Sequence, residues 1–452
     1  MDPITLGILS LVVLVALIAI RIPIGYSMIL VGGFGIMYMN GPALLFNQLK
    51  TLGWGVFSGY SLSVVPMFIL MGALASRAGL SQALFRGANA WLGWMRGGTA
   101  MAAIAGCAGF GAVCGSSLAT ASTMGKVALP ELKRYNYSGA LATGSLAAGG
   151  VLGILIPPSV VLIIYAILVE ANIVTMFAAA MLPGLLAVVL FILTIAIYVW
   201  FKPEAGPRHS GVDFQEWRDA TIGMIPVVVI FGLVLGGIYG GFFNPTPAAA
   251  VGAALVWIYG TAKGRLNLPA IFDSLKETAG TTGMIYLILI GAELMKIFMS
   301  RIGLPQATAE WIAGSGLAPF VVMAILLVAL ILLGCLMDSL SMILLVIPFF
   351  WPVLVEINGG LYVGAEGSGF GMSTEDLKIW FGILALIVVE LGLITPPVGM
   401  NVFVISALAK DTPMTETFKG VLPFFGAELV RVAILFAFPA VTLWLPQIIG
   451  SW

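Results

Sequence analysis

The sequence predicts an all-α polytopic membrane protein with about ten transmembrane helices and two re-entrant hairpins, arranged as an inverted repeat. Three observations carry this prediction. Hydrophobic residues make up 60% of the 452 residues and charged residues only 9%, whereas soluble proteins carry roughly 25% charged residues. Apolar runs long enough to cross a bilayer recur along the whole chain. Two of these runs are interrupted near their centres by a Pro-Pro pair.

The two interrupted runs cover residues 138–170 and 377–408, with Pro157-Pro158 in the first and Pro396-Pro397 in the second. Proline lacks an amide hydrogen and disfavours helix in the residue before it. A break that faced lipid would leave backbone polar groups unsatisfied, so it is stable only inside protein or beside a polar cavity. One broken membrane helix in each half of a chain is typical of secondary transporters.

The first repeat is predicted over residues 1–205. Its membrane spans are expected at about 4–20, 24–39, 62–76 and 175–201, with an amphipathic surface segment at 43–56. Residues 99–132 are rich in Gly, Ala and Ser and have basic residues on both flanks. Because basic flanks favour the cytoplasmic side, both ends lie on one face and the segment is predicted to be a re-entrant hairpin. Its tip is expected near residues 113–117.

The second repeat is predicted over residues 220–452, after a polar linker at 206–219 that holds the only histidine, His209. Spans are expected at about 221–240, 247–262, 280–299 and 424–445, with an amphipathic segment at 268–276. Residues 318–355 form the second hairpin candidate, with Asp338-Ser-Leu-Ser341 at its tip.

The distribution of basic residues sets the predicted orientation. Fifteen of the twenty Lys and Arg residues fall on segments assigned to the cytoplasm, which places both termini outside. The two halves then enter the membrane from opposite sides, as an inverted repeat requires. The N-terminus has no basic stretch or small-residue cleavage site, so it is expected to be a retained span.

Acidic residues in apolar segments are candidate functional groups. Asp338 has no partner in its own segment and is the strongest candidate. Glu390, just before the second break, is either a coupling acid or a partner of Lys126. The pairs Glu293–Lys296 and Glu428–Arg431 are expected to be self-neutralised. The tryptophans Trp91, Trp94, Trp351 and Trp380 are expected to be interfacial anchors.

Four stretches, residues 111–123, 129–159, 337–341 and 390–401, resemble the large membrane subunit of the tripartite ATP-independent periplasmic (TRAP) transporters. The resemblance covers essentially the whole chain. It implies sodium-coupled import of an organic anion, such as a C4-dicarboxylate, sialic acid or a sugar acid, across the bacterial inner membrane. It also implies a periplasmic substrate-binding protein and a small four-span subunit as partners, the latter a separate polypeptide. The hairpins and broken helices would move as an elevator against the remaining spans.

This resemblance turns the breaks into predicted sites. Unwound backbone and hydroxyl groups can supply the oxygen shell that sodium needs, and helix N-termini favour a substrate carboxylate. The residues expected to hold Na⁺ are Gly115, Ser116, Ile156 and Pro157 in one half and Asp338, Ser339, Ser341, Thr395 and Pro396 in the other. The residues expected to contact substrate are Ser117, Ser159, Ser339, Gly399 and Asn401.

Other function classes are less well supported. A stand-alone sodium/carboxylate symporter of similar design remains the alternative. A membrane enzyme is disfavoured because the chain has one histidine and no H-E-x-x-H motif. A channel is a third possible function that the sequence does not exclude. The absence of a P-loop excludes ATP as the direct energy source, and no basic patch indicates nucleic acid binding.

Overall fold

The computed structural model describes residues 2–208, 213–335 and 337–449, which form α-helices joined by short connections, with two short 3-10 turns and no strand in those ranges. His209 and the centre of the predicted linker lie outside the described residues. The first half contains α1 (Pro3–Ala19), α2 (Ile24–Asn40), α3 (Pro42–Ser58), α4 (Val64–Ala78), α5 (Leu80–Leu92), α6 (Gly98–Cys114), α7 (Ser117–Arg134), α8 (Gly139–Leu155), α9 (Val160–Leu168) and α10 (Ile173–Phe201). The second half contains α11 (Phe214–Tyr239), α12 (Pro245–Ala262), α13 (Leu268–Arg301), α14 (Leu304–Ser315), α15 (Pro319–Gly334), α16 (Ser339–Asn358), α17 (Thr374–Gly392), α18 (Met400–Leu408), α19 (Met414–Ala437) and α20 (Ala440–Ile449).

The protein is an all-helical, multi-span membrane protein. Six helices of the described part are long and apolar enough to cross a bilayer, and the bent pair α8–α9 would make a seventh. Shorter apolar helices include α1 and α2, which lie at predicted spans, and α6 and α15, which lie in the predicted hairpins. Exposed Val, Leu, Ile and Phe side chains cover the outer faces of α1, α10 and α11, as a lipid-facing surface requires.

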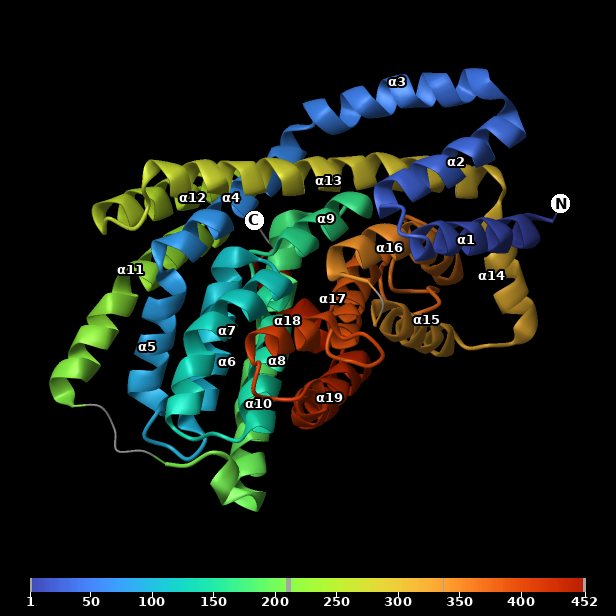
Figure 1. The fold of residues 1–452 in the computed structure, drawn as a ribbon. Helices are drawn as coiled ribbons and strands as arrows, with labels where there is room; N and C mark the ends of the chain where they lie inside the picture. The colour runs from blue at the N-terminus through green and yellow to red at the C-terminus, as the bar shows by residue number, and fades with distance from the viewer. Residues whose placement is uncertain (1, 209–212, 336, 450–452) are drawn as a thin grey trace.

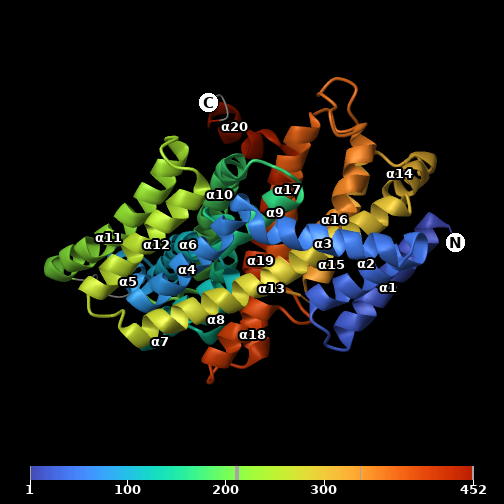
Figure 2. The same cartoon turned by 90° about the horizontal axis from the view of Figure 1, so that it is seen from above.

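Helices of the two halves pack on one another in reciprocal pairs. α2 packs on α13 and α4 packs on α12; α1 packs on α14 and α5 packs on α11; α9 packs on α16 and α18 packs on α7. Figures 1 and 2 show the α11–α12 end and the α1–α14 end at opposite sides of the molecule, with the hairpins between them. Such reciprocity is expected when two halves carry the same order of elements with opposite orientation.

The two segments predicted as re-entrant hairpins each form a pair of helices, α6–α7 and α15–α16. Gly115, with a positive φ of 65°, ends α6, and the Ser116 side chain caps α7 by accepting from the Ala119 amide at 3.5 Å. In the second hairpin Asp338 caps α16 by accepting from the Ser341 amide at 3.1 Å. Each tip is therefore a helix start with a side-chain cap, which satisfies amides that the first turn leaves free.

Glycines let each hairpin approach the broken helix beside it. A Cβ added to Gly111 of α6 would lie 2.4 Å from the Cα of Gly153 in α8. A Cβ added to Gly392 of α17 would lie 2.4 Å from the carbonyl carbon of Gly334 in α15. Gly111 and Gly392 are therefore packing residues, because no side chain fits between the two backbones.

The breaks in α8–α9 and α17–α18 lie where the Pro-Pro pairs stand, and both Pro-Pro bonds are cis. α8 and α9 meet at a bend of 45°. α17 ends at Gly392 and α18 begins at Met400, so the second break is longer than the first.

Several predicted boundaries are wrong. The segments at 268–276 and 280–299 form one continuous helix, α13, because no proline or other helix stop lies between them. α11 begins at Phe214, inside the predicted 206–219 linker, because Asp213 caps it. The predicted span 424–445 is divided between α19 and α20, where Pro439 cannot donate an amide to continue the helix. α5 and α14 were not predicted as separate helices.

The interfacial role predicted for Trp380 is also wrong. Trp380 is 0% exposed, and its indole Nε1 donates to the Leu435 carbonyl at 2.9 Å. Trp351 is likewise buried, whereas Trp91 and Trp94 are exposed. A buried indole needs a hydrogen-bond acceptor, and the carbonyl of α19 provides one for Trp380.

Candidate functional site

A cavity of about 420 Å³ lies where the two hairpin tips meet helices of the outer frame. Its walls come from α4 and α13 on one side and from α7, α9 and the start of α16 on the other. The polar residues that line it are Ser76, Arg77, Ser116, Ser117, Ser122, Thr123, Glu277, Thr281, Asp338 and Ser339. Five residues of the predicted sites thus share one cavity: Gly115, Ser116, Ser117, Asp338 and Ser339.

A single buried carboxylate joins the two tips. Glu390 of α17 is 0% exposed. The Ser117 hydroxyl donates to its Oε2 atom, and the Ser339 hydroxyl donates to its Oε1 atom. Ser117 is the first residue of α7 and Ser339 is the first residue of α16, so two helix N-termini converge on one acid. Helix N-termini favour a negative charge at this place.

The pairing of Glu390 with Lys126, one of the two alternatives that the sequence left open, is not formed. Lys126 instead lines a separate cavity between α5, α7 and α11, together with Arg86 and Arg134. In the described part of the chain no Lys or Arg lies within ion-pair distance of Glu390.

The other predicted residues of the first half lie just behind the first tip. Ile156, Pro157 and Ser159 are buried. The Ser159 hydroxyl caps α9 by accepting from the Leu162 amide at 3.4 Å. A Cβ added to Gly115 would lie 3.1 Å from the Val160 amide nitrogen, so the tip rests directly on the start of α9.

Four predicted residues at the second break do not line the cavity. The Thr395 hydroxyl donates to the Leu391 carbonyl at 2.6 Å, and Pro396 is exposed. Gly399 precedes α18 with a φ of 63°. The Asn401 side chain is fully buried and donates to the Ala147 carbonyl of α8 at 3.3 Å. Asn401 therefore faces α8, in the first half of the chain. Ser341, the remaining residue of this set, lies in the first turn of α16, where its amide is held by Asp338.

Two buried oxygen atoms near the first tip have no hydrogen-bond partner among the described residues: Thr120 Oγ1 and Asn401 Oδ1. Thr120 Oγ1 and the Ser116 carbonyl lie against Gly153, and the Asn401 amide lies against Gly150. A buried polar atom without a partner is costly, typically about 1–3 kcal/mol. Within the described ranges no cluster of three or more His, Cys, Asp or Glu residues could hold a metal ion. The donors present are hydroxyl, amide and carbonyl oxygens, which suit a hard cation such as Na⁺.

The sequence analysis missed a charged pair at the cavity wall. Arg77 of α4 lies 2.8 Å from Glu277 of α13, with side-chain exposures of 29% and 53%. Arg77 is the only basic side chain among the described residues that line this cavity. The sequence signalled it only as one of several basic residues at the end of a span, because nothing local indicates that α13 passes beside it.

The predicted pair Glu428–Arg431 is confirmed, and both side chains are fully buried. The predicted pair Glu293–Lys296 is wrong, because the Lys296 ammonium lies 3.7 Å from Glu170, in the α9–α10 connection. Lys296 thereby links α13 to the broken helix of the first half.

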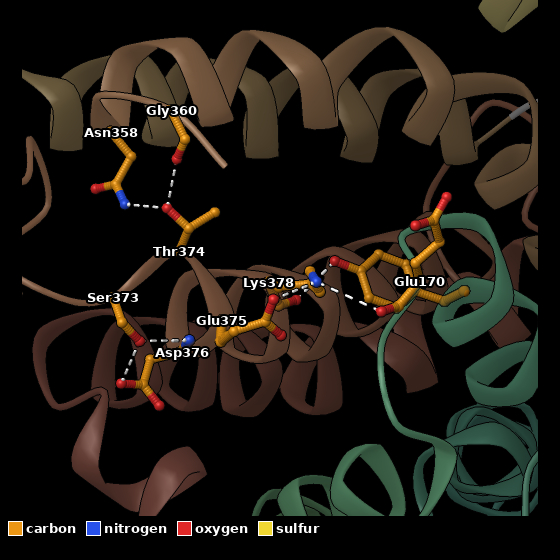
Figure 3. A network of polar contacts seen from close by, with 9 residues as sticks. Glu170, Asn358, Gly360, Ser373, Thr374, Glu375, Asp376 and Lys378 are labelled. Atoms are coloured by element: carbon orange, nitrogen blue, oxygen red, sulfur yellow. Dashed lines mark hydrogen bonds and ion pairs between the residues drawn. The ribbon is translucent and has the colours of Figure 1, made fainter. Parts of the chain in front are cut away.

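Figure 3 shows a polar network that holds the far end of α17. The Lys378 ammonium donates to Glu375 at 2.7 Å and to the Glu170 carbonyl at 3.4 Å. The Thr374 hydroxyl donates to the Gly360 carbonyl at 2.7 Å and accepts from the Asn358 amide at 3.0 Å. These bonds tie the α16–α17 connection to the start of α17 and to the end of α9.

Comparison with known proteins identifies the family. Residues 11–441 match the family model described as the DctM component of the tripartite ATP-independent periplasmic transporters. The chain belongs to the DctM family. Its family is one of transporter permeases, which confirms the predicted recognition and the prediction that the chain is not an enzyme.

Two relatives of this DctM-family chain are named for different substrates. It is 35% identical to the C4-dicarboxylate TRAP transporter large permease protein DctM of Pseudomonas aeruginosa, over 86% of this chain and 87% of that protein. It is 29% identical to the sialic acid TRAP transporter large permease protein SiaM of Vibrio cholerae, over 94% and 95% of the two chains. The fold is similar to that of the YdaH transporter of Alcanivorax borkumensis, with a TM-score of 0.61, 16% identity, and coverage of 91% and 89%.

Proposed function

We propose that this DctM-family permease carries out sodium-coupled import of a carboxylate-bearing organic anion by an elevator movement. One observation carries the proposal: the tips of both hairpins, one from each half, line the same cavity with α4 and α13. A carrier of this design needs its substrate between the moving tips and the fixed frame. The alternative, a stand-alone symporter that needs no binding protein, would use the same cavity.

The substrate class follows from the walls of the cavity and from the family. Arg77 offers a fixed positive charge, and α7 and α16 begin at the opposite wall, where their N-termini favour an anion. A volume of about 420 Å³ suits a small organic acid. The C4-dicarboxylate and sialic acid names of the relatives support a carboxylate substrate for this chain. Ser117, Ser159, Ser339, Gly399 and Asn401 are the proposed residues of substrate binding. Ser117 and Ser339 line this cavity and can meet a carboxylate through a bound cation, whereas the other three do not line it.

Sodium, when bound, would supply a positive charge that attracts the substrate carboxylate to the tips. In the first half Gly115, Ser116, Ile156 and Pro157 are proposed to hold one ion, and the unpartnered Thr120 oxygen beside Ser116 supports a cation there. In the second half the proposed residues are Asp338, Ser339, Ser341, Thr395 and Pro396. The oxygen donors at both places fit a hard cation.

The moving part in this proposal consists of α6–α9 and α15–α18, held together by Glu390 between the tips and by the Lys378 network at the far end. The frame consists of the reciprocal pairs α2–α13 and α4–α12. The Lys296–Glu170 ion pair joins the frame to the moving part in the present conformation. It is expected to break when the moving part shifts.

The tripartite family name supports two partners, a small four-span membrane subunit and a periplasmic substrate-binding protein. We place the chain in a bacterial inner membrane with both termini in the periplasm. Charge asymmetry between the loops supports this orientation.

Transport in proteoliposomes tests the function. The chain is reconstituted with its small subunit, and uptake of a labelled C4-dicarboxylate or sialic acid is measured under an inward sodium gradient, with and without the binding protein. Uptake that needs both sodium and the binding protein is expected. Uptake that ignores sodium would overturn the coupling, and full uptake without the binding protein would favour the stand-alone symporter.

A further inference from the structure

The hydroxyl groups of Ser117 and Ser339 have a defined direction because of Glu390. A serine hydroxyl has one hydrogen and two acceptor lone pairs. Ser117 gives its hydrogen to Glu390 Oε2, and Ser339 gives its hydrogen to Glu390 Oε1. Both serines also line the cavity. Their oxygens therefore have only lone pairs left to present to a ligand.

A surface of lone pairs accepts a cation and repels a carboxylate. The position of the acid strengthens this preference, because a carboxylate directly behind two oxygen ligands attracts positive charge in front of them. Glu390 is fully buried, and no basic side chain of the described residues pairs with it. Arg431, the buried cation of α19, is paired with Glu428, so the charge of an ionised Glu390 would be available to compensate a cation at the tips.

We infer that Glu390 is a positioning residue that clamps the two hairpin tips together and fixes both serine hydroxyls as acceptors for a monovalent cation. The inference rests on the proposed sodium coupling and deepens it. Ser117 and Ser339 then face a cation, and a substrate carboxylate meets them only through that cation. One acid serves both tips, so sodium sites in the two halves share one support.

Replacing Glu390 by glutamine reverses the direction of one of the two serine hydrogen bonds. In the Glu390→Gln variant one side-chain atom remains an acceptor, while the amide nitrogen can only donate. One serine must then accept from the amide, and its own hydrogen is released toward the cavity. A hydrogen aimed at the cavity opposes a cation, so the affinity for sodium falls even when the fold is retained.

The test measures sodium binding directly, separately from transport. Thermal unfolding of the purified full-length chain is followed across a NaCl titration, with choline chloride holding ionic strength constant. The half-saturating sodium concentration is expected to rise at least tenfold in Glu390→Gln. Glu428→Gln, which also removes a buried carboxylate but does not touch the tips, is the matched control. It is expected to lower the melting temperature and to leave half-saturation unchanged.

Glu390→Asp covers the case in which the glutamine variant does not fold. Aspartate keeps the charge but is one methylene shorter, so it cannot reach both serines, and an intermediate rise in half-saturation is expected. Wild-type half-saturation in either folded Glu390 variant overturns the inference. A wild-type protein that shows no sodium-specific stabilisation instead overturns the proposed coupling, which separates the two failures.

Discussion

Replacing Arg77 by glutamine tests whether the cavity binds an anion at its frame wall. The guanidinium is partly buried, with 29% of its side chain exposed, so a bond to a substrate carboxylate would be weaker than a fully buried one. Hydrogen bonds to charged groups contribute roughly 1.5–3 kcal/mol. Taking the lower end for this exposure, about 1.5 kcal/mol, the KM for substrate should rise roughly tenfold.

The neighbouring acid gives the same experiment a second arm with the opposite sign. Glu277 lies 2.8 Å from the Arg77 guanidinium and would compete with a substrate carboxylate for it. Exposed ion pairs contribute about 0.2–1 kcal/mol, so Glu277→Gln should lower the KM by up to roughly fivefold. Both variants are assayed by initial rates of uptake in proteoliposomes at saturating sodium. An unchanged KM in Arg77→Gln, or a KM that rises in both variants, would refute the assignment of Arg77 to the substrate.

Three further predictions concern packing, access and charge. Gly111→Ala should destabilise the protein by roughly 1–3 kcal/mol, because the added Cβ would lie 2.4 Å from the α8 backbone. The control Gly280→Ala should not destabilise it, because no atom lies within 4 Å of the added Cβ. Thermal unfolding of both variants measures the difference. Cys114 lines the cavity, but burial disfavours its thiolate, so a small maleimide should alkylate it only slowly. Substrate with sodium should slow the reaction severalfold further in a time course followed by mass spectrometry, and equal rates with and without ligand would count against binding there. Glu428→Met should lower the free energy of unfolding by about 3–5 kcal/mol, because it leaves the Arg431 charge buried and unpaired. The double variant Glu428→Met/Arg431→Met should recover most of that stability in chemical denaturation. If it recovers none, the pair stabilises the protein through its packing and not through its charges.

The sequence was informative wherever the signal was local. Pro157 and Pro396 mark the breaks because proline acts on its own backbone and on the residue before it. Asp338 and Ser116 mark the hairpin tips because helix caps have side-chain preferences. Both classes of signal lie within a few residues of the feature that they predict.

Contacts between distant segments could not be predicted in the same way. Arg77 meets Glu277 only because α4 and α13 pack together, and the sequence gives no distance between them. The partner of Lys296 was wrongly predicted as Glu293, three residues away, for the same reason. Residue spacing reveals a possible partner on the same helix, but it does not reveal Glu170, which is distant in the sequence. Trp380 was assigned to the membrane interface because tryptophan is enriched there. It is buried instead because α19 packs over it and accepts its indole hydrogen, a contact that the sequence does not reveal.

The two halves differ at the position of the buried acid Glu390, whose counterpart in the first half is apolar. The close glycine contacts align Gly153 of α8 with Gly392 of α17, and in each half a Pro-Pro pair begins four residues later. Two residues before these glycines stand Val151 in the first half and Glu390 in the second, both 0% exposed. The first half therefore has an apolar side chain where the second has the acid, and the tip of the first hairpin depends on the second half for the acceptor of its Ser117 hydrogen. If each tip holds a sodium ion, both ions lie near Glu390 but only the second also has Asp338 beside it, so the two ions have unequal surroundings and their binding should be coupled rather than independent.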